Sequence, residues 1–131
     1  MNILYIGFDI EGVGGIATYS RYQVRALRDL GHALRVVSVN KTTMRFAPGY
    51  VDRHIEFSGR AAVVAGLLGE VLTRRYDAIV FNHVYLAMFG RIARALNGAR
   101  YTINVYNVDI LETLPRFREY AFGQADLIIS D

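Results

Sequence analysis

The sequence predicts an α/β domain of the doubly wound, Rossmann-like class, with a mostly parallel sheet and helices on both faces. Two observations predict it. Strand-like and helix-like segments alternate along the chain, and the strand-like segments are nearly continuous apolar runs, which is typical of strands buried on both faces. A chain of 131 residues with 53% hydrophobic residues and no internal repeat or linker is expected to form a single domain over residues 1–131.

The apolar pattern justifies each element in chain order. The run NILYIGF, residues 2–8, has the length and composition of a strand, and a glycine-rich stretch follows it. Residues 16–32 then place apolar side chains at helical spacing, with Gly31 as the expected stop signal. The buried face of this helix is expected to contain Ile16, Tyr19 or Ser20, Gln23 or Val24, Leu27 and Leu30. The same criteria predict strands over 33–40, 54–58, 77–83, 100–107 and 126–131, and helices over 60–75, 86–98 and 115–125.

The composition excludes several classes of function. The chain has no cysteine, so it carries neither a disulfide framework nor a thiolate metal site, and its three histidines are scattered. The net charge is +3, and fourteen of the fifteen basic residues are arginine, whose planar guanidinium group suits phosphate and carboxylate. These arginines lack the interleaved aromatic residues of a nucleic-acid platform, so no nucleic-acid partner is expected.

The N-terminus gives an expectation about location. No basic segment precedes the first apolar run, and that run is too short for a signal sequence. We therefore expect a cytoplasmic protein. Because the arginines also suit an anionic surface, a peripheral contact at the inner face of the membrane stays open beside the simpler interpretation that they are solvated on helix faces.

Ligands of a doubly wound sheet lie beyond the carboxyl ends of its strands. This rule selects four segments for the chemistry: 9–15, 41–52, Asn82 with His83, and 106–109. Asn82 and His83 end an apolar strand, where the pair could hydrogen-bond a bound ligand. A histidine that caps the next helix is an equal alternative.

The stretch GFDIEGVGGIATYS, residues 7–20, admits three interpretations. Its G-x-G-x-x-A pattern matches a dinucleotide fingerprint, but two carboxylates, Asp9 and Glu11, stand between the strand and the glycines. Asn40 occupies the place of the acidic residue that binds a ribose, although the following lysine keeps NADP open. The glycines could form a purely structural turn. Alternatively, Gly14 and Gly15 let the backbone approach a ligand, with amides at the helix start donating to its oxygens.

A family resemblance adds to the third interpretation. The chain contains, in this order, GVGGIATYSRYQVRALRDLGHALRVVSVN, YDAIVFNHVYLAMFGRIARALNGARYTINVYNVD and ADLIISD. Their order and spacing resemble the N-terminal domain of the retaining family-four glycosyltransferases of GT-B fold, over essentially the whole chain. The shared parts are the glycine pair after the first strand, L…LGHAL…VV at the end of the first helix, the DAIVFNH strand and ADLIIS at the last strand.

The resemblance implies a site. Gly14 and Gly15 would lie against the phosphate of the donor or against the acceptor, with Phe8 and Asp9 lining the approach. The family often has a histidine in a V-H-G-x-D-like segment that contacts the transferred sugar or its phosphate. The matching residues here run from Val105 to Asp109, and Tyr106 replaces the histidine. A phenol can hydrogen-bond a sugar hydroxyl but does not titrate near neutral pH as an imidazole does.

The resemblance also implies an activity. The complete enzyme would transfer a sugar from a nucleotide-sugar co-substrate to a glycan, lipid or small-molecule acceptor with retention. Helix amides and basic residues, rather than a metal or cofactor, would stabilise the leaving diphosphate. The chain is then the acceptor-side domain, with the C-terminal donor-binding domain absent, and by itself is expected to be inactive. Two alternatives stay open: a fragment of an NAD(P)-dependent oxidoreductase and a non-catalytic Rossmann-like binding module.

The helix predicted over 60–75 suggests a further partner. Its apolar residues spread over more than half of the helix circumference, which exceeds what one sheet face needs. Such an excess tends to be covered by association. We therefore expect a homo-oligomer that uses this helix or the face from which the second domain is missing.

Overall fold

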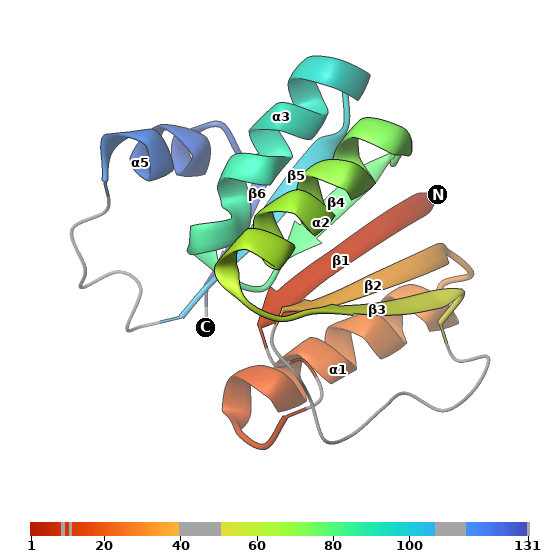
Figure 1. The fold of residues 1–131 in the computed structure, drawn as a ribbon. Helices are drawn as coiled ribbons and strands as arrows, with labels where there is room; N and C mark the ends of the chain where they lie inside the picture. The colour runs from red at the N-terminus through yellow and green to blue at the C-terminus, as the bar shows by residue number, and fades with distance from the viewer. Residues whose placement is uncertain (9, 11, 40–50, 107–114, 131) are drawn as a thin grey trace.

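The computed structural model describes residues 1–8, 10, 12–39, 51–106 and 115–130, and it shows a six-stranded sheet (Figure 1). The strand order is β3-β2-β1-β4-β5-β6, and every neighbouring pair is parallel. The predicted Rossmann-like class is confirmed. The strands are β1 (Asn2–Phe8), β2 (Ala33–Val39), β3 (Arg53–Phe57), β4 (Ala78–Phe81), β5 (Arg100–Val105) and β6 (Leu127–Ser130).

Helices cover both faces of this sheet. Figure 1 shows α1 on one face, and α2 and α3 on the other. Side chains of β1 alternate between the two layers: Leu4 and Ile6 pack with α2 and α3, whereas Ile3 and Tyr5 pack with α1. The helical segments are α1 (Gly15–Asp29), α2 (Arg60–Thr73), the short 3₁₀ turn η1 (Val84–Leu86), α3 (Ala87–Asn97) and α5 (Arg116–Gly123).

The buried face of α1 agrees in part with the expected one, since Ser20 and Val24 are buried and Leu27 packs against the core. The helix buries Ala17, Ser20 and Val24, while Ile16 and Leu30 are exposed. The buried positions carry small side chains, which let the helix backbone approach the sheet closely. The larger apolar residues lie on the flanks of this narrow stripe, because the contact needs little side-chain volume. Helical periodicity identified the helix and the middle of its buried face, but it missed Ala17 and wrongly included Ile16 and Leu30.

The apolar character of α2 has both a buried and an exposed part. Leu67 and Val71 are fully buried against the sheet, whereas Val64 and Leu72 are 47% and 60% exposed. Self-association through this helix stays a prediction. Within the described ranges of the chain, no helix is both long and apolar enough to span a membrane.

The strand order locates the crevice in which a ligand would bind. The chain moves outward from β1 through β2 to β3, and then returns to the other side of β1 to add β4, β5 and β6. The order therefore reverses between β1 and β4. In open parallel sheets the ligand crevice lies outside the carboxyl ends of the strands at this reversal.

Candidate functional site

Asn82 lies at the reversal point and ties three elements together. Its side chain is fully buried directly after β4. Its Oδ1 accepts a hydrogen bond from the Phe8 amide at 2.9 Å, and its Nδ2 donates to the Phe8 carbonyl at 3.3 Å and to the Ser20 hydroxyl at 3.2 Å. These contacts hold the end of β1 against β4 and α1. Because the Asn82 amide group is hydrogen-bonded within the protein, we expect Asn82 to hold the site in place rather than to contact a ligand.

This arrangement explains a glycine that the sequence analysis did not single out. A Cβ atom at Gly7 would lie 2.3 Å from Asn82 Nδ2 and 2.4 Å from its Cγ. No side chain fits at that distance unless the amide moves. The signal was present in the sequence as a glycine near the end of a strand, which often marks a close approach.

Gly14 and Gly15 lie where the loop after β1 enters α1. Gly14 has a φ of 142°, in the region that favours glycine, and its carbonyl accepts the Thr18 amide at 2.9 Å. Gly15 is the first helical residue and has no such positive φ. A Cβ atom at either glycine would meet nothing within 4 Å. Packing therefore does not require a glycine at position 15, and its absent side chain leaves open space before the helix.

The start of α1 is also electrostatically open. The first turn contains no acidic residue, and the N-cap residue is Gly14, which has no side chain to cap it. The first amides of a helix have no intrahelical acceptor, and the helix dipole adds partial positive charge at that end. The start of α1 therefore has the donors and the partial charge that an anion or a sugar hydroxyl can accept.

Arg21 braces the loop and was missed by the sequence analysis. Its Nη1 donates to the Gly12 carbonyl at 2.7 Å and to the Ile10 carbonyl at 3.4 Å, and its Nη2 donates to the Thr18 hydroxyl at 3.1 Å. The guanidinium group thereby fixes the loop onto the helix that follows. Only its position on the first helix could have indicated this role, and that signal is weak because the helix carries several arginines.

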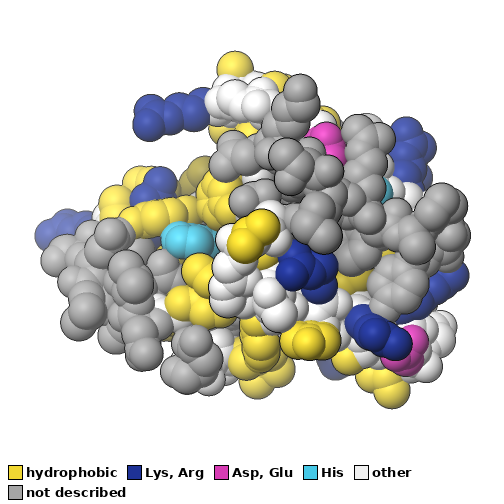
Figure 2. Space-filling view, turned by 90° about the horizontal axis from the view of Figure 1, so that it is seen from below, with side chains coloured by type: hydrophobic (Ala, Val, Ile, Leu, Met, Phe, Trp, Pro, Cys, Tyr) yellow, Lys and Arg dark blue, Asp and Glu magenta, His cyan; other side chains and the backbone are white. Residues whose placement is uncertain are grey.

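His83 caps η1 and belongs to an aromatic group. Its Nδ1 accepts a hydrogen bond from the Tyr85 amide at 3.3 Å, so the helix-capping alternative is what the structure shows. The imidazole stacks on the Tyr85 ring at 4.7 Å and meets the edge of the Phe8 ring at 5.4 Å. The Arg118 guanidinium group of α5 covers the Tyr85 ring at 4.2 Å. Figure 2 shows a histidine at the surface among hydrophobic side chains.

Tyr106 forms a separate contact on the α1 side. It is buried directly after β5, and its ring meets the edge of the Tyr19 ring at 6.3 Å. The site residues predicted from the sequence thus divide into two groups, Phe8 with Asn82 and His83, and Tyr106 beside α1. Asp9 and Asp109 lie outside the described residues, as does most of the loop over 41–52.

Three hydrogen-bonded side chains beneath α1 connect this helix to strands β1 and β5 of the sheet. The Tyr5 hydroxyl donates to Gln23 Oε1 at 2.8 Å, and Gln23 exchanges hydrogen bonds with the buried Asn104 side chain. Burial raises the pKa of Tyr5 far above its ordinary value, so the phenol stays protonated. The group connects β1, α1 and β5, and thereby positions the α1 N-terminus over the reversal point. Across the described segments, no set of three potential ligand side chains could hold a metal ion.

Comparison with known proteins decides the family. The model of the glycosyl transferase 4-like domain matches residues 14–128. The chain belongs to this family. The match begins at the glycine pair, spans η1 and α3, and ends in β6, so it includes every element of the site described above except β1. No curated protein sequence matches the chain.

Solved structures support the fold of this glycosyl transferase 4-like domain. The apo form of the lipopolysaccharide outer core galactosyltransferase WaaB aligns with 98% of this chain at a TM-score of 0.54 and 15% identity. The chain spans only 38% of the length of that structure. A protein of unknown function from Vibrio parahaemolyticus aligns with 98% of this chain and 92% of its own length, at a TM-score of 0.51 and 8% identity.

Proposed function

We propose that the chain is the acceptor-side domain of a GT-B glycosyltransferase that transfers a sugar, with retention, from a nucleotide-sugar donor to an acceptor. Membership of the glycosyl transferase 4-like family supports the reaction class. The likeness to a galactosyltransferase of which this chain spans 38% supports a larger working enzyme, in which a second domain completes the cleft. In the complete cleft, the start of α1 would meet the phosphate of the donor that the second domain holds, so a weak contact with the donor is what this chain alone can show.

The observation that carries the proposal is the open start of α1. Gly14 needs a glycine for its backbone conformation, but Gly15 does not need one for its conformation or for packing. A ligand that approaches the first amides of the helix supplies the missing reason. The donors are fixed before the ligand arrives, so they can stabilise charge on a phosphate without reorganising.

Other residues of this edge would serve the sugar ring or hold the donors in place. The half-buried His83 combines an apolar ring with polar nitrogens, and Phe8 and Tyr85 surround it. Tyr106 brings a phenol to the end of the neighbouring strand. Arg21 and Asn82 are positioning residues, because they hold the loop and the end of β1. No step needs a metal or a cofactor.

A dinucleotide-dependent enzyme is the alternative from a different class. The strand order is shared with dinucleotide-binding domains, so it does not discriminate between the two. The loop does discriminate. Six residues, 9–14, separate β1 from α1, whereas the fingerprint places its first glycine in a tight turn at the strand end. The longer loop favours the glycosyltransferase interpretation.

Calorimetric titration of the chain with UDP-galactose, UDP and NADP tests the proposal. We expect weak, saturable binding of UDP-galactose or UDP and none of NADP. Gly15→Leu places a side chain in the open space and should abolish this binding. Gly69→Leu is the matched control, because it also lies in a helix where a Cβ meets nothing within 4 Å, and it should bind like the parent chain. Tight NADP binding, or equal binding by the Gly15 and Gly69 variants, would contradict the proposal.

A further inference from the structure

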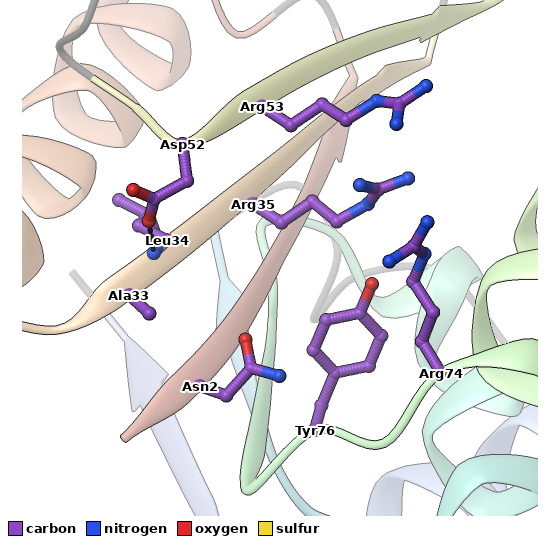
Figure 3. Close-up of a pocket in the computed structure, with 8 residues that line it drawn as sticks. All are labelled: Asn2, Ala33, Leu34, Arg35, Asp52, Arg53, Arg74 and Tyr76. Atoms are coloured by element: carbon purple, nitrogen blue, oxygen red, sulfur yellow. Dashed lines mark hydrogen bonds between the residues drawn. The ribbon is translucent and has the colours of Figure 1, made fainter.

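A basic pocket lies at the edge of the sheet where the strands begin, opposite the candidate site. It has a volume of about 240 Å³ and is lined at the starts of β1, β2 and β3 and by the chain between α2 and β4. Figure 3 shows the guanidinium groups of Arg35 and Arg53 extending from the strands and that of Arg74 approaching them from the opposite side, with the Tyr76 hydroxyl directed toward them. No part of the proposed transfer site uses these residues.

The pairing of β2 with β3 brings two of these arginines together. Arg35 and Arg53 are directly opposite each other in the register of the two strands. Like charges at opposite positions of a sheet repel and destabilise the pair. Neighbouring residues of both strands, Val37 and Ile55, pack on the α2 side, so this face is otherwise apolar. A third guanidinium group, from Arg74, adds to the same charge.

One carboxylate partly offsets this charge. Glu70 of α2 is buried and accepts two hydrogen bonds from Arg35, at 2.7 and 2.6 Å, and a third from the Tyr76 hydroxyl at 2.7 Å. Its Oε2 lies 3.8 Å from Arg74 Nε, at the outer limit of an ion pair. Although burial raises the pKa of Glu70, the hydrogen bonds from Arg35 and Tyr76 lower it below its ordinary value, so the carboxylate stays charged.

The other carboxylate of the pocket is engaged elsewhere. Asp52 accepts a hydrogen bond from the Leu34 amide and pairs with Arg28 of α1 at 3.3 Å. Its charge is therefore matched by a guanidinium group from outside the pocket. Among the described residues, three arginines and the Glu70 carboxylate leave two positive charges in the pocket without a counter-ion.

Donor groups in the pocket are unused as well. Among the described residues, Arg35 Nη1 makes no hydrogen bond, and Arg53 and Arg74 donate none. Guanidinium groups match the oxygen geometry of phosphate through paired N–H donors. We propose that this pocket binds the phosphate group of a phosphomonoester. The volume is smaller than that of pockets which enclose a drug-sized ligand, so it suits a terminal phosphate rather than a whole nucleotide.

The pocket is distinct from the transfer site. The seven residues of β1 separate the two edges of the sheet, which places them about 20 Å apart at the usual rise per strand residue. One small ligand cannot bridge them. The inference therefore does not depend on the proposed function, and a test of one leaves the other standing.

Titration with inorganic phosphate, followed by the NMR signals of the arginine Nε–H groups, tests the pocket. We expect saturable shifts of Arg35, Arg53 and Arg74. Arg53→Gln removes an exposed arginine that has no partner among the described residues, and should weaken phosphate binding about tenfold, the effect of losing one charge-assisted hydrogen bond. Arg60→Gln is the matched control, since it removes the same charge from the exposed start of α2 and should leave the affinity unchanged.

Vesicles identify the source of the phosphate group. Phosphatidylcholine vesicles with and without phosphatidic acid are compared for binding of the parent chain and of Arg53→Gln. Binding that needs both phosphatidic acid and Arg53 assigns the pocket to a lipid headgroup. Saturable phosphate binding without vesicle binding assigns it to a soluble phosphomonoester. Absence of saturable phosphate shifts at the three arginines, or equal weakening by Arg53→Gln and Arg60→Gln, would overturn the proposal.

Discussion

The two edges of the sheet offer polar groups to a ligand in different ways. At the carboxyl edge, the described residues present main-chain amides, glycines and aromatic rings, and close packing around Asn82 holds the end of β1. At the amino edge, the polar groups are the charged side chains of Arg35, Glu70 and their neighbours. Ligand binding should therefore depend on the shape of the backbone at the carboxyl edge, and on charged side chains at the amino edge.

This difference has consequences for how each edge tolerates change. Substitutions other than proline leave the main-chain donors in place, so the carboxyl edge is disturbed mainly by adding atoms. Charged side chains are removed easily, and their partners are then left buried without a counter-charge. Substitutions that add volume and substitutions that remove charge should thus act on opposite edges.

The largest effect is expected from Glu70→Ala. The Arg35 side chain is 11% exposed and would lose its only carboxylate partner among the described residues, so the free energy of unfolding should fall by about 3–5 kcal/mol. Urea denaturation measures this loss. The double variant Arg35→Met with Glu70→Leu should recover most of it, because neither charge then remains buried. A single variant as stable as the parent would show that the ion pair does not hold this edge.

Gly7→Ala should have a somewhat smaller effect at the carboxyl edge. The new Cβ would displace the Asn82 amide and leave the Phe8 amide without its acceptor, so we expect a loss of about 3 kcal/mol from overpacking and the broken hydrogen bond. Urea denaturation again measures it. Gly69→Ala, where a Cβ meets nothing within 4 Å, should instead be neutral or slightly stabilising. Equal stability of the two variants would contradict the packing at the reversal point.

The smallest effect is expected from lowering the pH, which reduces the stabilising contribution of Glu70. The hydrogen bonds from Arg35 and Tyr76 hold the pKa of Glu70 below its ordinary value despite its burial. A carboxyl group with a lowered pKa in the folded state stabilises the protein above its unfolded pKa, and this contribution is lost as the pH falls through the folded pKa. The difference in melting temperature between the parent and Glu70→Gln should therefore shrink as the pH falls. A difference that is constant with pH would exclude this contribution.

The sequence predicted the layers of the fold and part of the site. Continuous apolar runs such as residues 2–8 identified strands, because a strand buried on both faces needs no polar side chains. The glycine pair was also found from sequence, since it stands at a strand-to-helix junction. The inward role of Asn82 could not be found, because it depends on its hydrogen bonds to Phe8 and Ser20, which lie far away in the sequence and come close only when the strands pair.

The arginine pocket was invisible for a related reason. Arg35, Arg53 and Arg74 are far apart in the chain and come together only through the register of β2 with β3 and the return of the chain after α2. The buried face of α1 was predicted only in part, because hydrophobicity favours large apolar residues such as Ile16, whereas the close approach to the sheet selects Ala17. Pattern analysis therefore finds elements more readily than it finds contacts between them.

The central claim is that a sugar-nucleotide ligand binds at the carboxyl edge through the start of α1. Amide NMR shifts of the labelled chain during titration with UDP-galactose test it most directly, because they show at which edge the ligand binds. The account predicts shifts at Gly14 to Thr18 and around His83, no shifts at Arg35 or Arg53, and loss of the shifts in Gly15→Leu. Shifts confined to the amino edge, or shifts that persist in Gly15→Leu, would contradict it.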